Sequence, residues 1–177
     1  MTTTTKDAVA LDEKSRRDFL YIAAGAFGAV GAAAAVWPFV SQMSPSADVL
    51  AQKEIEVDVT PIQVGQVVTV KWQSKPVFIW HRTPKDIKDA ESVNVAELRD
   101  PQTDEQRVQK PEWLILVGIC THLGCIPVAH EGPFDGFLCH CHGSVYDTSG
   151  RIRQGPAPAN LLVPPYKFLS ATKVQIG

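Results

Sequence analysis

A long apolar segment near the amino terminus is followed by short alternating runs over the rest of the chain. Residues 19–40 form 22 consecutive positions without a charged side chain. As a helix, this segment would be about 33 Å long, which is enough to cross a hydrocarbon core of about 30 Å. The pattern therefore predicts one transmembrane anchor helix over 19–40, and a cleaved signal peptide is the alternative.

Basic residues close to this segment lie on its amino-terminal side. Lys14, Arg16 and Arg17 precede it, whereas the first basic residue after it is Lys53. Because basic flanks stay in the cytoplasm, we expect a single-pass inner-membrane protein with residues 1–18 cytoplasmic and the rest periplasmic. The cytoplasmic segment has no apolar period and is expected to be disordered or frayed.

The flank also has the form of an export signal. Ser15–Leu20 reads SRRDFL and resembles a twin-arginine signal, which carries folded proteins across the membrane. Export in the folded state suits a domain whose cofactor is inserted in the cytoplasm. We expect the helix that follows to remain in place as the anchor.

The chain changes to strand patterns after a short polar stretch. Residues 41–54 are mostly polar or small and predict a flexible linker, with a helical turn around 48–52. Alternation and valine-rich runs then predict strands at 54–59, 64–72, 76–82, 112–119, 137–138, 144–146, 151–153, 167–169 and 172–176.

One short helix is expected among these strands. Thr83 and Pro84 predict its cap and first turn, and it should end near Ala90. Residues 91–111 are charged and are expected to form a loop. The elements together predict a mainly β fold, with a small antiparallel domain on a linker.

Composition and cysteine placement narrow the chemistry. The chain has 177 residues and a net charge of −2, which gives no basic surface for nucleic acid. Its four cysteines all lie within residues 120–141 and therefore predict one local site.

Two short motifs carry this site, and each offers a thiolate and an imidazole. They are Cys120–Cys125 (CTHLGC) and Cys139–Ser144 (CHCHGS). Such ligands could hold zinc as Cys2His2, or a [2Fe–2S] centre in which two histidines replace two cysteines on one iron. A four-ligand site leaves two cysteines over, and in an oxidising compartment a disulfide between the loops would use them.

The two motifs resemble the cluster loops of the Rieske iron–sulfur subunit of the cytochrome bc1 complex (ubiquinol–cytochrome c reductase), of the alphaproteobacterial and mitochondrial type. The resemblance extends through HRTP, ELRDPQ and GRIRQGPAPANL and so covers nearly the whole chain. It implies an antiparallel β-sandwich head over 55–177, with a small cluster-binding subdomain at about 113–160. It also implies that residues 41–54 act as a hinge.

The resemblance assigns the site residues. It implies a [2Fe–2S] cluster whose ligands are Cys120, His122, Cys139 and His142. It also implies a disulfide between Cys125 and Cys141. Ser144 resembles a serine that hydrogen-bonds a bridging sulfide, and Tyr146 a tyrosine that hydrogen-bonds a ligand sulfur. Leu123 matches a leucine that shields the cluster, and Gly155–Pro158 matches a covering loop. His140 departs from the family, which usually has proline there.

The resemblance also implies the function. The cluster would take an electron from ubiquinol at the cytochrome b site, coupled to a proton at a ligand histidine. Movement of the head would pass the electron to cytochrome c1, within a dimeric complex. His142 is assigned to the quinol contact, and His122 is the second candidate.

Three alternatives remain at this point. A Rieske ferredoxin or oxygenase carrier would share the ligands but usually lacks the second cysteine pair and the anchor. The small Rieske subunit of another exported oxidase, such as arsenite oxidase, resembles the loops and the export signal. A structural zinc domain would be colourless and redox-silent.

Overall fold

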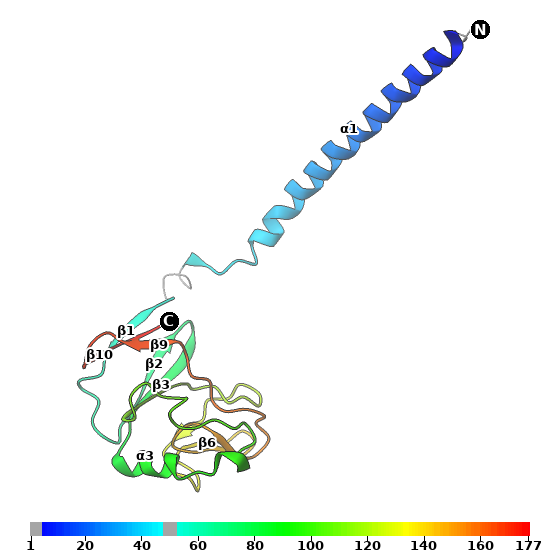
Figure 1. The fold of residues 1–177 in the computed structure, drawn as a ribbon. Helices are drawn as coiled ribbons and strands as arrows, with labels where there is room; N and C mark the ends of the chain where they lie inside the picture. Colours follow the sequence, from blue (N-terminus) through cyan, green and yellow to red (C-terminus); the bar gives the residue numbers. More distant parts are fainter. Residues whose placement is uncertain (1–4, 48–52) are drawn as a thin grey trace. The chain divides into compact units, whose positions relative to one another are not determined.

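The computed structural model describes residues 5–47 and 53–177, with side chains from Arg16 onward. The described residues divide into two units, an amino-terminal helical unit that ends at Ser46 and a β-rich head from Ala47 to Gly177. Figure 1 shows the elements of each unit.

Helix α1 (Thr5–Ser41) forms the first unit and contains 37 residues. It begins well before the apolar segment, so the expectation that residues 1–18 are disordered or frayed is wrong for residues 5–18. This stretch is rich in alanine, leucine, glutamate, lysine and arginine, which are good helix formers. A helix already nucleated in the apolar segment extends through them at little cost.

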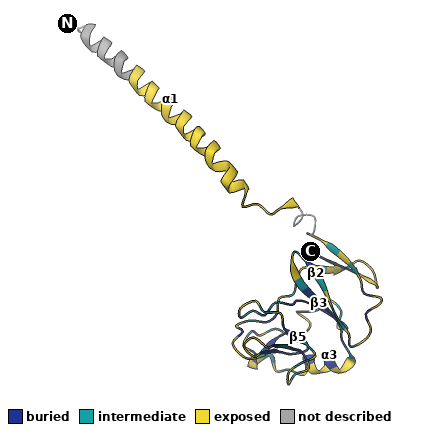
Figure 2. Ribbon diagram, turned by 180° about the vertical axis from the view of Figure 1, so that it is seen from behind, coloured by how far each residue is buried: buried dark blue, intermediate teal, exposed yellow. Residues whose placement is uncertain are grey.

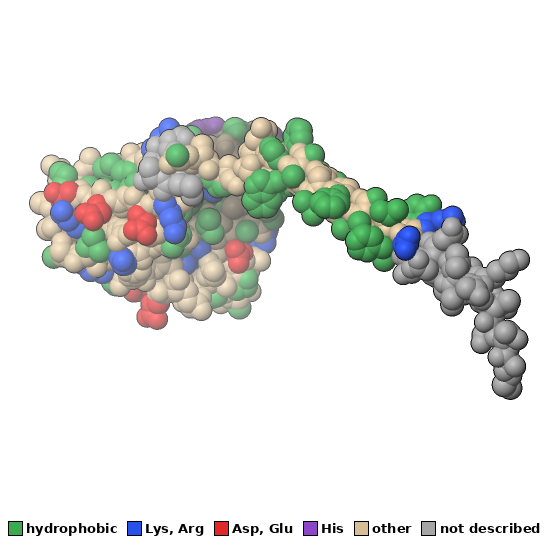
Figure 3. All heavy atoms as spheres, turned by 90° about the horizontal axis from the view of Figure 1, so that it is seen from above, with side chains coloured by type: hydrophobic (Ala, Val, Ile, Leu, Met, Phe, Trp, Pro, Cys, Tyr) green, Lys and Arg blue, Asp and Glu red, His purple; other side chains and the backbone are tan. Residues whose placement is uncertain are grey.

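The carboxyl-terminal part of α1 has the length and composition to cross a membrane. Arg16–Ser41 spans 26 residues, and an 18-residue window within it has a mean hydropathy of 1.9. Its apolar side chains are exposed, including Trp37 at 69% and Phe39 at 71%, and Figure 3 shows them along the described length of the helix. The linker expected at 41–54 is described in part, and its expected helical turn at 48–52 lies outside the described residues.

The described residues of the head form three antiparallel sheets. The first has the order β1-β10-β9, with bounds Ile55–Asp58, Lys173–Ile176 and Tyr166–Phe168. The second has the order β2-β3-β4, with bounds Val67–Trp72, Lys75–His81 and Trp113–Val117. The third has the order β5-β6-β7-β8, with bounds Val128–Ala129, Phe137–Cys139, Ser144–Tyr146 and Ile152–Gln154. The mainly β, antiparallel fold predicted from the sequence is confirmed.

The second sheet is buried on both faces. In β3, Val77 and Ile79 enter one hydrophobic core, whereas Phe78 and Trp80 enter the other. The strand predicted at 76–82 is confirmed as β3, and both sets of its side chains face a core. The first core is shared with β10, and the second with the sheet that contains β6 and β7. Figure 2 colours each described residue by its burial.

Helix α3 (Pro84–Glu91) follows β3 as the sequence predicts. Thr83 caps it, since its Oγ1 accepts from the backbone N–H of Asp86, and the Asp86 carboxylate accepts from the backbone N–H of Thr83. This reciprocal pair satisfies two amide groups at the helix start. A 3-10 turn, η1 (Val95–Glu97), lies in the segment expected to be a loop.

Three buried arginines attach the loop before β4 to the third sheet and its turns. Arg82 pairs with Asp104 at 2.8 Å, and Arg151 pairs with Asp147 at 2.9 Å. Arg107 donates to the carbonyl oxygens that follow β7, and burial lowers its pKa to about 10, so it remains charged at neutral pH. Buried charges of this kind are retained only when they are paired and hydrogen-bonded.

Candidate metal centre

The first predicted loop follows β4 and closes on itself. The backbone N–H of Cys120 donates to the carbonyl of Cys125 at 2.8 Å, and the N–H of Gly124 donates to the carbonyl of Cys120 at 3.0 Å. Gly124 has a φ of +83°, a conformation that glycine adopts without strain. The turn places Cys120 at its base and His122 near its tip.

The second predicted loop is the turn of the β6–β7 hairpin. Cys139 ends β6 and Ser144 begins β7, and these two residues are register partners. The N–H of Gly143 donates to the carbonyl of Cys139 at 2.9 Å, and Gly143 has a φ of +73°. A cysteine again lies at the base, whereas His142 lies in the exposed turn.

A disulfide joins the two loops. It links Cys125 and Cys141, which are separated by 16 residues and whose Cα atoms lie 6.7 Å apart. The Sγ atoms of Cys125, Cys139 and Cys141 lie within 4.8 Å of one another, so the disulfide lies beside one of the free thiols. Cys120 and Cys139 are free and buried.

Two imidazoles meet on the outer side of the same loops. The Nδ1 atoms of His122 and His142 lie 3.2 Å apart, and their rings are perpendicular with centroids 4.6 Å apart. Two buried thiols below two facing imidazoles form a donor set that fits a [2Fe–2S] centre with mixed ligands, and its composition also fits tetrahedral zinc.

A tyrosine hydroxyl contacts the first thiol. The Tyr146 hydroxyl lies 3.2 Å from the Sγ of Cys120 and is buried in the core behind the loops. Burial raises the pKa of Cys120, but hydrogen bonds from Tyr146, from the backbone at His122 and from Ser144 outweigh it and hold this pKa below its usual value. Burial, followed by the contact with Cys120, raises the pKa of Tyr146, so the phenol stays protonated.

The predicted covering loop lies directly against the second cluster loop. The backbone N–H of Ala157 donates to the Oγ of Ser144 at 3.2 Å. Gly155 has a φ of +93°, and a Cβ atom placed on it would lie 2.6 Å from the carbonyl oxygen of Gly143. Leu123, the predicted shielding residue, is 70% exposed beside His122.

The other histidines do not join this group. The Nε2 of His140 lies 2.5 Å from a carboxylate oxygen of Glu131, on the surface next to the second loop. His81 stacks on Trp113 with centroids 4.1 Å apart, and its Nδ1 bonds the carbonyl of Ile62. Neither of these two residues was among the predicted ligands.

Two contacts of the site were not predicted. The Oγ1 of Thr121 donates to the carbonyl of Ala159 at 2.6 Å, which ties the first loop to the segment after the covering loop. Arg99 donates to the carbonyl of Gly155 at 2.7 Å. The position of Thr121 between two predicted ligands could have indicated a role in the site. Arg99 lies 56 residues from Gly155, so no short sequence motif could have predicted this contact.

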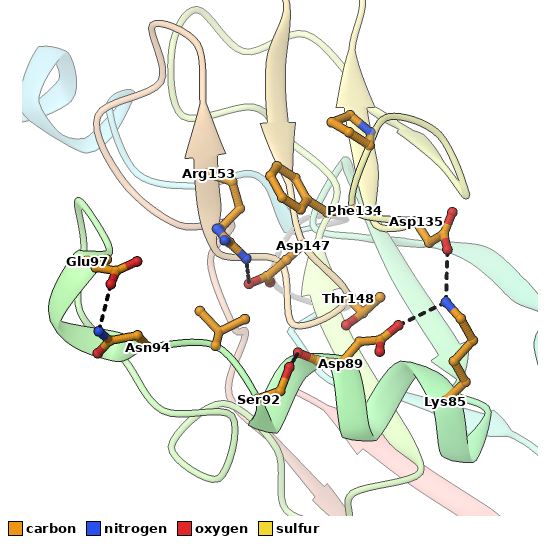
Figure 4. A pocket seen from close by; sticks show the side chains of 12 residues that line it. Lys85, Asp89, Ser92, Asn94, Glu97, Phe134, Asp135, Asp147, Thr148 and Arg153 are labelled. Carbon is orange, nitrogen blue, oxygen red and sulfur yellow. Dashed lines mark hydrogen bonds and ion pairs between the residues drawn. The ribbon is translucent and has the colours of Figure 1, made fainter.

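A separate polar cavity of about 520 Å³ lies between α3 and the third sheet (Figure 4). Lys85 bridges Asp89 and Asp135 across it, and Arg153 lies over the Phe134 ring. Its walls contain none of the thiols or imidazoles described above. The candidate metal centre is therefore not a cavity but a pair of surface loops.

Two family models match the chain. The one described as "Ubiquitinol-cytochrome C reductase Fe-S subunit TAT signal" matches residues 7–46, and the one described as "Rieske [2Fe-2S] domain" matches residues 52–167. The second decides between the two kinds of centre that the donor set fits. The cofactor is a Rieske-type [2Fe–2S] cluster, and the zinc alternative is wrong.

Named relatives agree along nearly the whole chain. The ubiquinol–cytochrome c reductase iron–sulfur subunit of Bradyrhizobium diazoefficiens is 61% identical over 96% of this chain and 98% of that protein. The subunit of the same name from Rhodospirillum rubrum is 58% identical, with 93% of each chain covered. The mitochondrial cytochrome b-c1 complex subunit Rieske of Neurospora crassa is 54% identical over 90% of this chain and 70% of that protein.

A solved chain titled "Hyperthermophilic respiratory Complex III" is 34% identical, over 87% of this chain and 98% of that chain, with a TM-score of 0.49. The family models and the curated relatives do not support the alternative of an arsenite oxidase subunit. This chain itself has an apolar helix that could cross a membrane, a disulfide between the two cluster loops and a match to the Rieske domain model. The chain belongs to the family of Rieske iron–sulfur subunits of ubiquinol–cytochrome c reductase.

Proposed function

We propose that this chain is the electron-transferring subunit of a cytochrome bc1 complex and that Cys120, His122, Cys139 and His142 hold its cluster. The observation that carries this proposal is the meeting of two buried thiols and two surface imidazoles on loops tied by a disulfide. When bound, a cluster with two imidazole ligands supplies a one-electron couple at about −150 to +300 mV, well above plant-type ferredoxins at about −400 mV.

The buried side of the centre holds the thiolates and adjusts the potential. Cys120 and Cys139 are each 2% exposed and belong to the hydrophobic core behind the loops. The hydroxyls of Tyr146 and Ser144 both lower the pKa of the Cys120 thiol there. Hydroxyls that donate to sulfur favour the more electron-rich reduced state and raise the potential. Without these donors, the core alone would disfavour the added negative charge.

The exposed side of the centre receives the substrate. An imidazole bound through one ring nitrogen keeps the other nitrogen at the surface, where it can hold a proton. His142 is exposed in the turn, and apolar Leu123 and Ile126 are exposed close by at 70% and 60%. We assign the contact with ubiquinol, at the cytochrome b surface, to His142 and retain His122 as the second candidate.

The two units of the chain have separate roles in this proposal. Helix α1 anchors the subunit in the inner membrane with its amino terminus in the cytoplasm, as Arg16 and Arg17 at the start of the apolar segment favour. The head lies in the periplasm, where an oxidising environment preserves the disulfide between Cys125 and Cys141. Residues 41–54 act as the hinge that lets the head move from cytochrome b to cytochrome c1, within a dimeric complex.

An electron paramagnetic resonance spectrum of the purified complex after reduction with ascorbate tests this function. We expect a Rieske signal with this mild reductant, because a centre with two histidine ligands has a high potential. Co-purification of b- and c-type haem is the second expected result. A colourless preparation that gives no signal even with dithionite would contradict the proposal.

A paired substitution then tests the ligand set. His142→Ala and His122→Ala should each abolish the signal, because each removes one of four ligands. His130→Ala is the matched control, since His130 is exposed in the same subdomain but lies away from the two loops, with its ring on Trp80. Retention of a native signal in His142→Ala would remove this residue from the proposed ligands.

A further inference from the structure

Two consecutive residues, Arg99 and Asp100, hold the covering loop and Asn160, which lies two residues after it. The Nη1 of Arg99 donates to the carbonyl oxygens of Gly155 at 2.7 Å and Ala157 at 2.5 Å. The carboxylate of Asp100 accepts from the backbone N–H of Asn160 at 2.9 Å, and its carbonyl accepts from the Asn160 side chain at 3.0 Å. We call this set of contacts the Arg99–Asp100 clamp.

The loop cannot make these contacts by itself. Pro156 and Pro158 have no backbone N–H, so the loop has few donors for its own carbonyls. One donor that it does have, the N–H of Ala157, is used by Ser144. The guanidinium of Arg99 therefore supplies the donors that the carbonyls on either side of Pro156 lack, and hydrogen bonds from a charged donor are stronger than those between neutral groups.

A small movement of the loop would reach the site directly. Ala157 is fully buried, and Gly155 packs so closely that an added Cβ would lie 2.6 Å from both the carbonyl oxygen of Gly143 and the Cα of Ser144. The Oγ of Ser144 accepts from Ala157, so its own hydrogen is left to donate toward sulfur. The position of Ala157 thus sets the direction in which the Ser144 hydroxyl donates.

We propose that Arg99, together with Asp100, is a positioning residue for the iron–sulfur centre. The clamp fixes Ala157 on Ser144, keeps the Ser144 hydroxyl directed at the centre, and keeps water out from under the loop. The proposal rests on the proposed function, because it concerns a cluster held by the two loops. The alternative explanation is that the positive charge of Arg99 alone alters the midpoint potential, in which case its hydrogen bonds to the loop would have no effect.

Substitutions in the full complex test the clamp, with two readouts. The readouts are the midpoint potential, from a titration followed by electron paramagnetic resonance, and the half-life of the cluster's visible circular dichroism on warming. Arg99→Gln should lower the midpoint potential and shorten the half-life by about fivefold, because charged hydrogen bonds to the loop are lost. Arg99→Lys should restore most of both values, since a single nitrogen makes both bonds.

Arg153→Gln is the matched control for charge. Arg153 is in the same subdomain, but its guanidinium lies 4.3 Å from the Phe134 ring centroid and faces Asp147 at 3.7 Å. We expect the midpoint potential and half-life of this variant to equal those of the wild type. Equal shifts in Arg99→Gln and Arg153→Gln, or no shift in Arg99→Gln, would overturn the proposal.

Asp100→Ala separates the two explanations by sign, because it removes both the negative charge and the side-chain acceptor of the Asn160 N–H. Loss of a negative charge by itself would raise the midpoint potential, whereas a loosened clamp would lower it and shorten the half-life of the cluster. This variant also tests the clamp if the complex with Arg99→Gln does not assemble. A midpoint at or above the wild-type value with an unchanged half-life would overturn the clamp.

The wild-type complex keeps this test separate from that of the proposed function. If the wild type shows no Rieske signal after ascorbate, the proposed function fails. If the wild type shows the signal and the clamp variants match it in both readouts, only the clamp fails.

Discussion

The hydroxyl of Tyr146 lies 3.2 Å from the Sγ of Cys120 and 3.3 Å from the backbone nitrogen of Thr121. The N–H of Thr121 can only donate, so the phenol oxygen accepts from it, and the single phenol hydrogen remains available for the sulfur. One side chain from β7 thereby fixes both the position and the electronic environment of the first cluster loop.

Tyr146→Phe should therefore lower the midpoint potential of the cluster. A lost hydrogen bond of about 1.4 kcal/mol corresponds to roughly 60 mV for a one-electron couple. Ser144→Ala should act in the same direction, and the double variant should lose more than either alone. Protein film voltammetry measures all three.

Tyr166→Phe is the control for these variants. The Tyr166 hydroxyl accepts from the backbone N–H of Gln109, and the residue packs against the core that does not contain the thiols. Its removal should leave the potential unchanged. An unchanged midpoint in Tyr146→Phe would show that the phenol does not donate to the sulfur in the protein with its cluster.

The midpoint potential should fall as the pH rises. Oxidation adds positive charge beside His122 and His142, so the reduced form holds a proton that the oxidised form gives up more readily. Reduction that is coupled to proton uptake becomes less favourable as the proton activity falls. Voltammetry from pH 6 to pH 10 checks the slope, and a flat line would refute proton coupling at these residues.

Gly155→Ala should damage the site more than Gly124→Ala. Both glycines have positive φ angles, +93° and +83°, so both substitutions carry a backbone cost of about 1 kcal/mol. At Gly124 nothing lies within 4 Å of an added Cβ, whereas at Gly155 it would meet the backbone of Gly143 and Ser144. We expect Gly155→Ala to lose its cluster faster on warming.

The same pair offers an internal check on this reasoning. Circular dichroism in the visible range follows the cluster, while the far-ultraviolet signal follows the fold. Equal half-lives for the two alanine variants would mean that the covering loop can shift without disturbing the second cluster loop.

The stability of the head should fall at acid pH because Asp104 becomes protonated. Burial raises the pKa of Asp104, but hydrogen bonds from Arg82 and Ser149 and the charges of Arg82 and Arg151 outweigh it and lower this pKa. The pKa of Asp104 is lower in the folded state than its unfolded-state value of about 3.9. The stabilisation is therefore complete above the unfolded-state pKa and is lost as the pH falls through the folded-state pKa. Thermal unfolding of the wild type at a series of pH values should show this loss.

Asp104→Asn should destabilise the head by about 3 to 5 kcal/mol at neutral pH, because Arg82 is left as an unbalanced buried charge. It should also flatten the acid dependence. Asp89→Asn is the matched control: its partner Lys85 is exposed, and such surface pairs contribute about 0 to 1 kcal/mol. Equal falls in Tm for the two variants would argue against the buried pair as the source.

Stiffening the linker should slow turnover without altering the cluster. Two prolines introduced between residues 44 and 53 would restrict the backbone there, so a head that must visit two partners would move less freely. Quinol–cytochrome c reductase activity should fall while the electron paramagnetic resonance spectrum stays as in the wild type. Normal activity with a rigid linker would mean that the segment is only a spacer.

Local signals in the sequence predicted most of the strands. The expected strand at 144–146 matches β7, and Thr83 and Pro84 begin α3 as predicted. Strand β5 was missed because two residues are too short to show a period. The double burial of β3 was also missed, because the partners of its second face lie far along the chain.

The residues of the candidate site also divide into those that a local sequence signal predicted and those that it did not. The two loops are short motifs, so their thiols and imidazoles could be assigned from the residues they contain and from family resemblance. The contacts that support them join distant segments: Arg82 with Asp104 across 22 residues, and Arg99 with Gly155 across 56. A single sequence holds no periodic signal for such pairs, so they appear only in the folded chain.

The pairing of β1 with β10 has a mechanical consequence. The linker enters the head at β1, whose first residue, Ile55, is opposite Ile176 near the end of the chain. Any pull transmitted from the anchor reaches the head through this pair of strands and through the Lys53 carbonyl, which accepts from the Trp72 indole of β2 at 2.9 Å. Four residue pairs between β1 and β10, and the bond from Gly177 to Pro165, resist that force. The head can thus be pulled on its tether while the geometry around its electron carrier stays fixed.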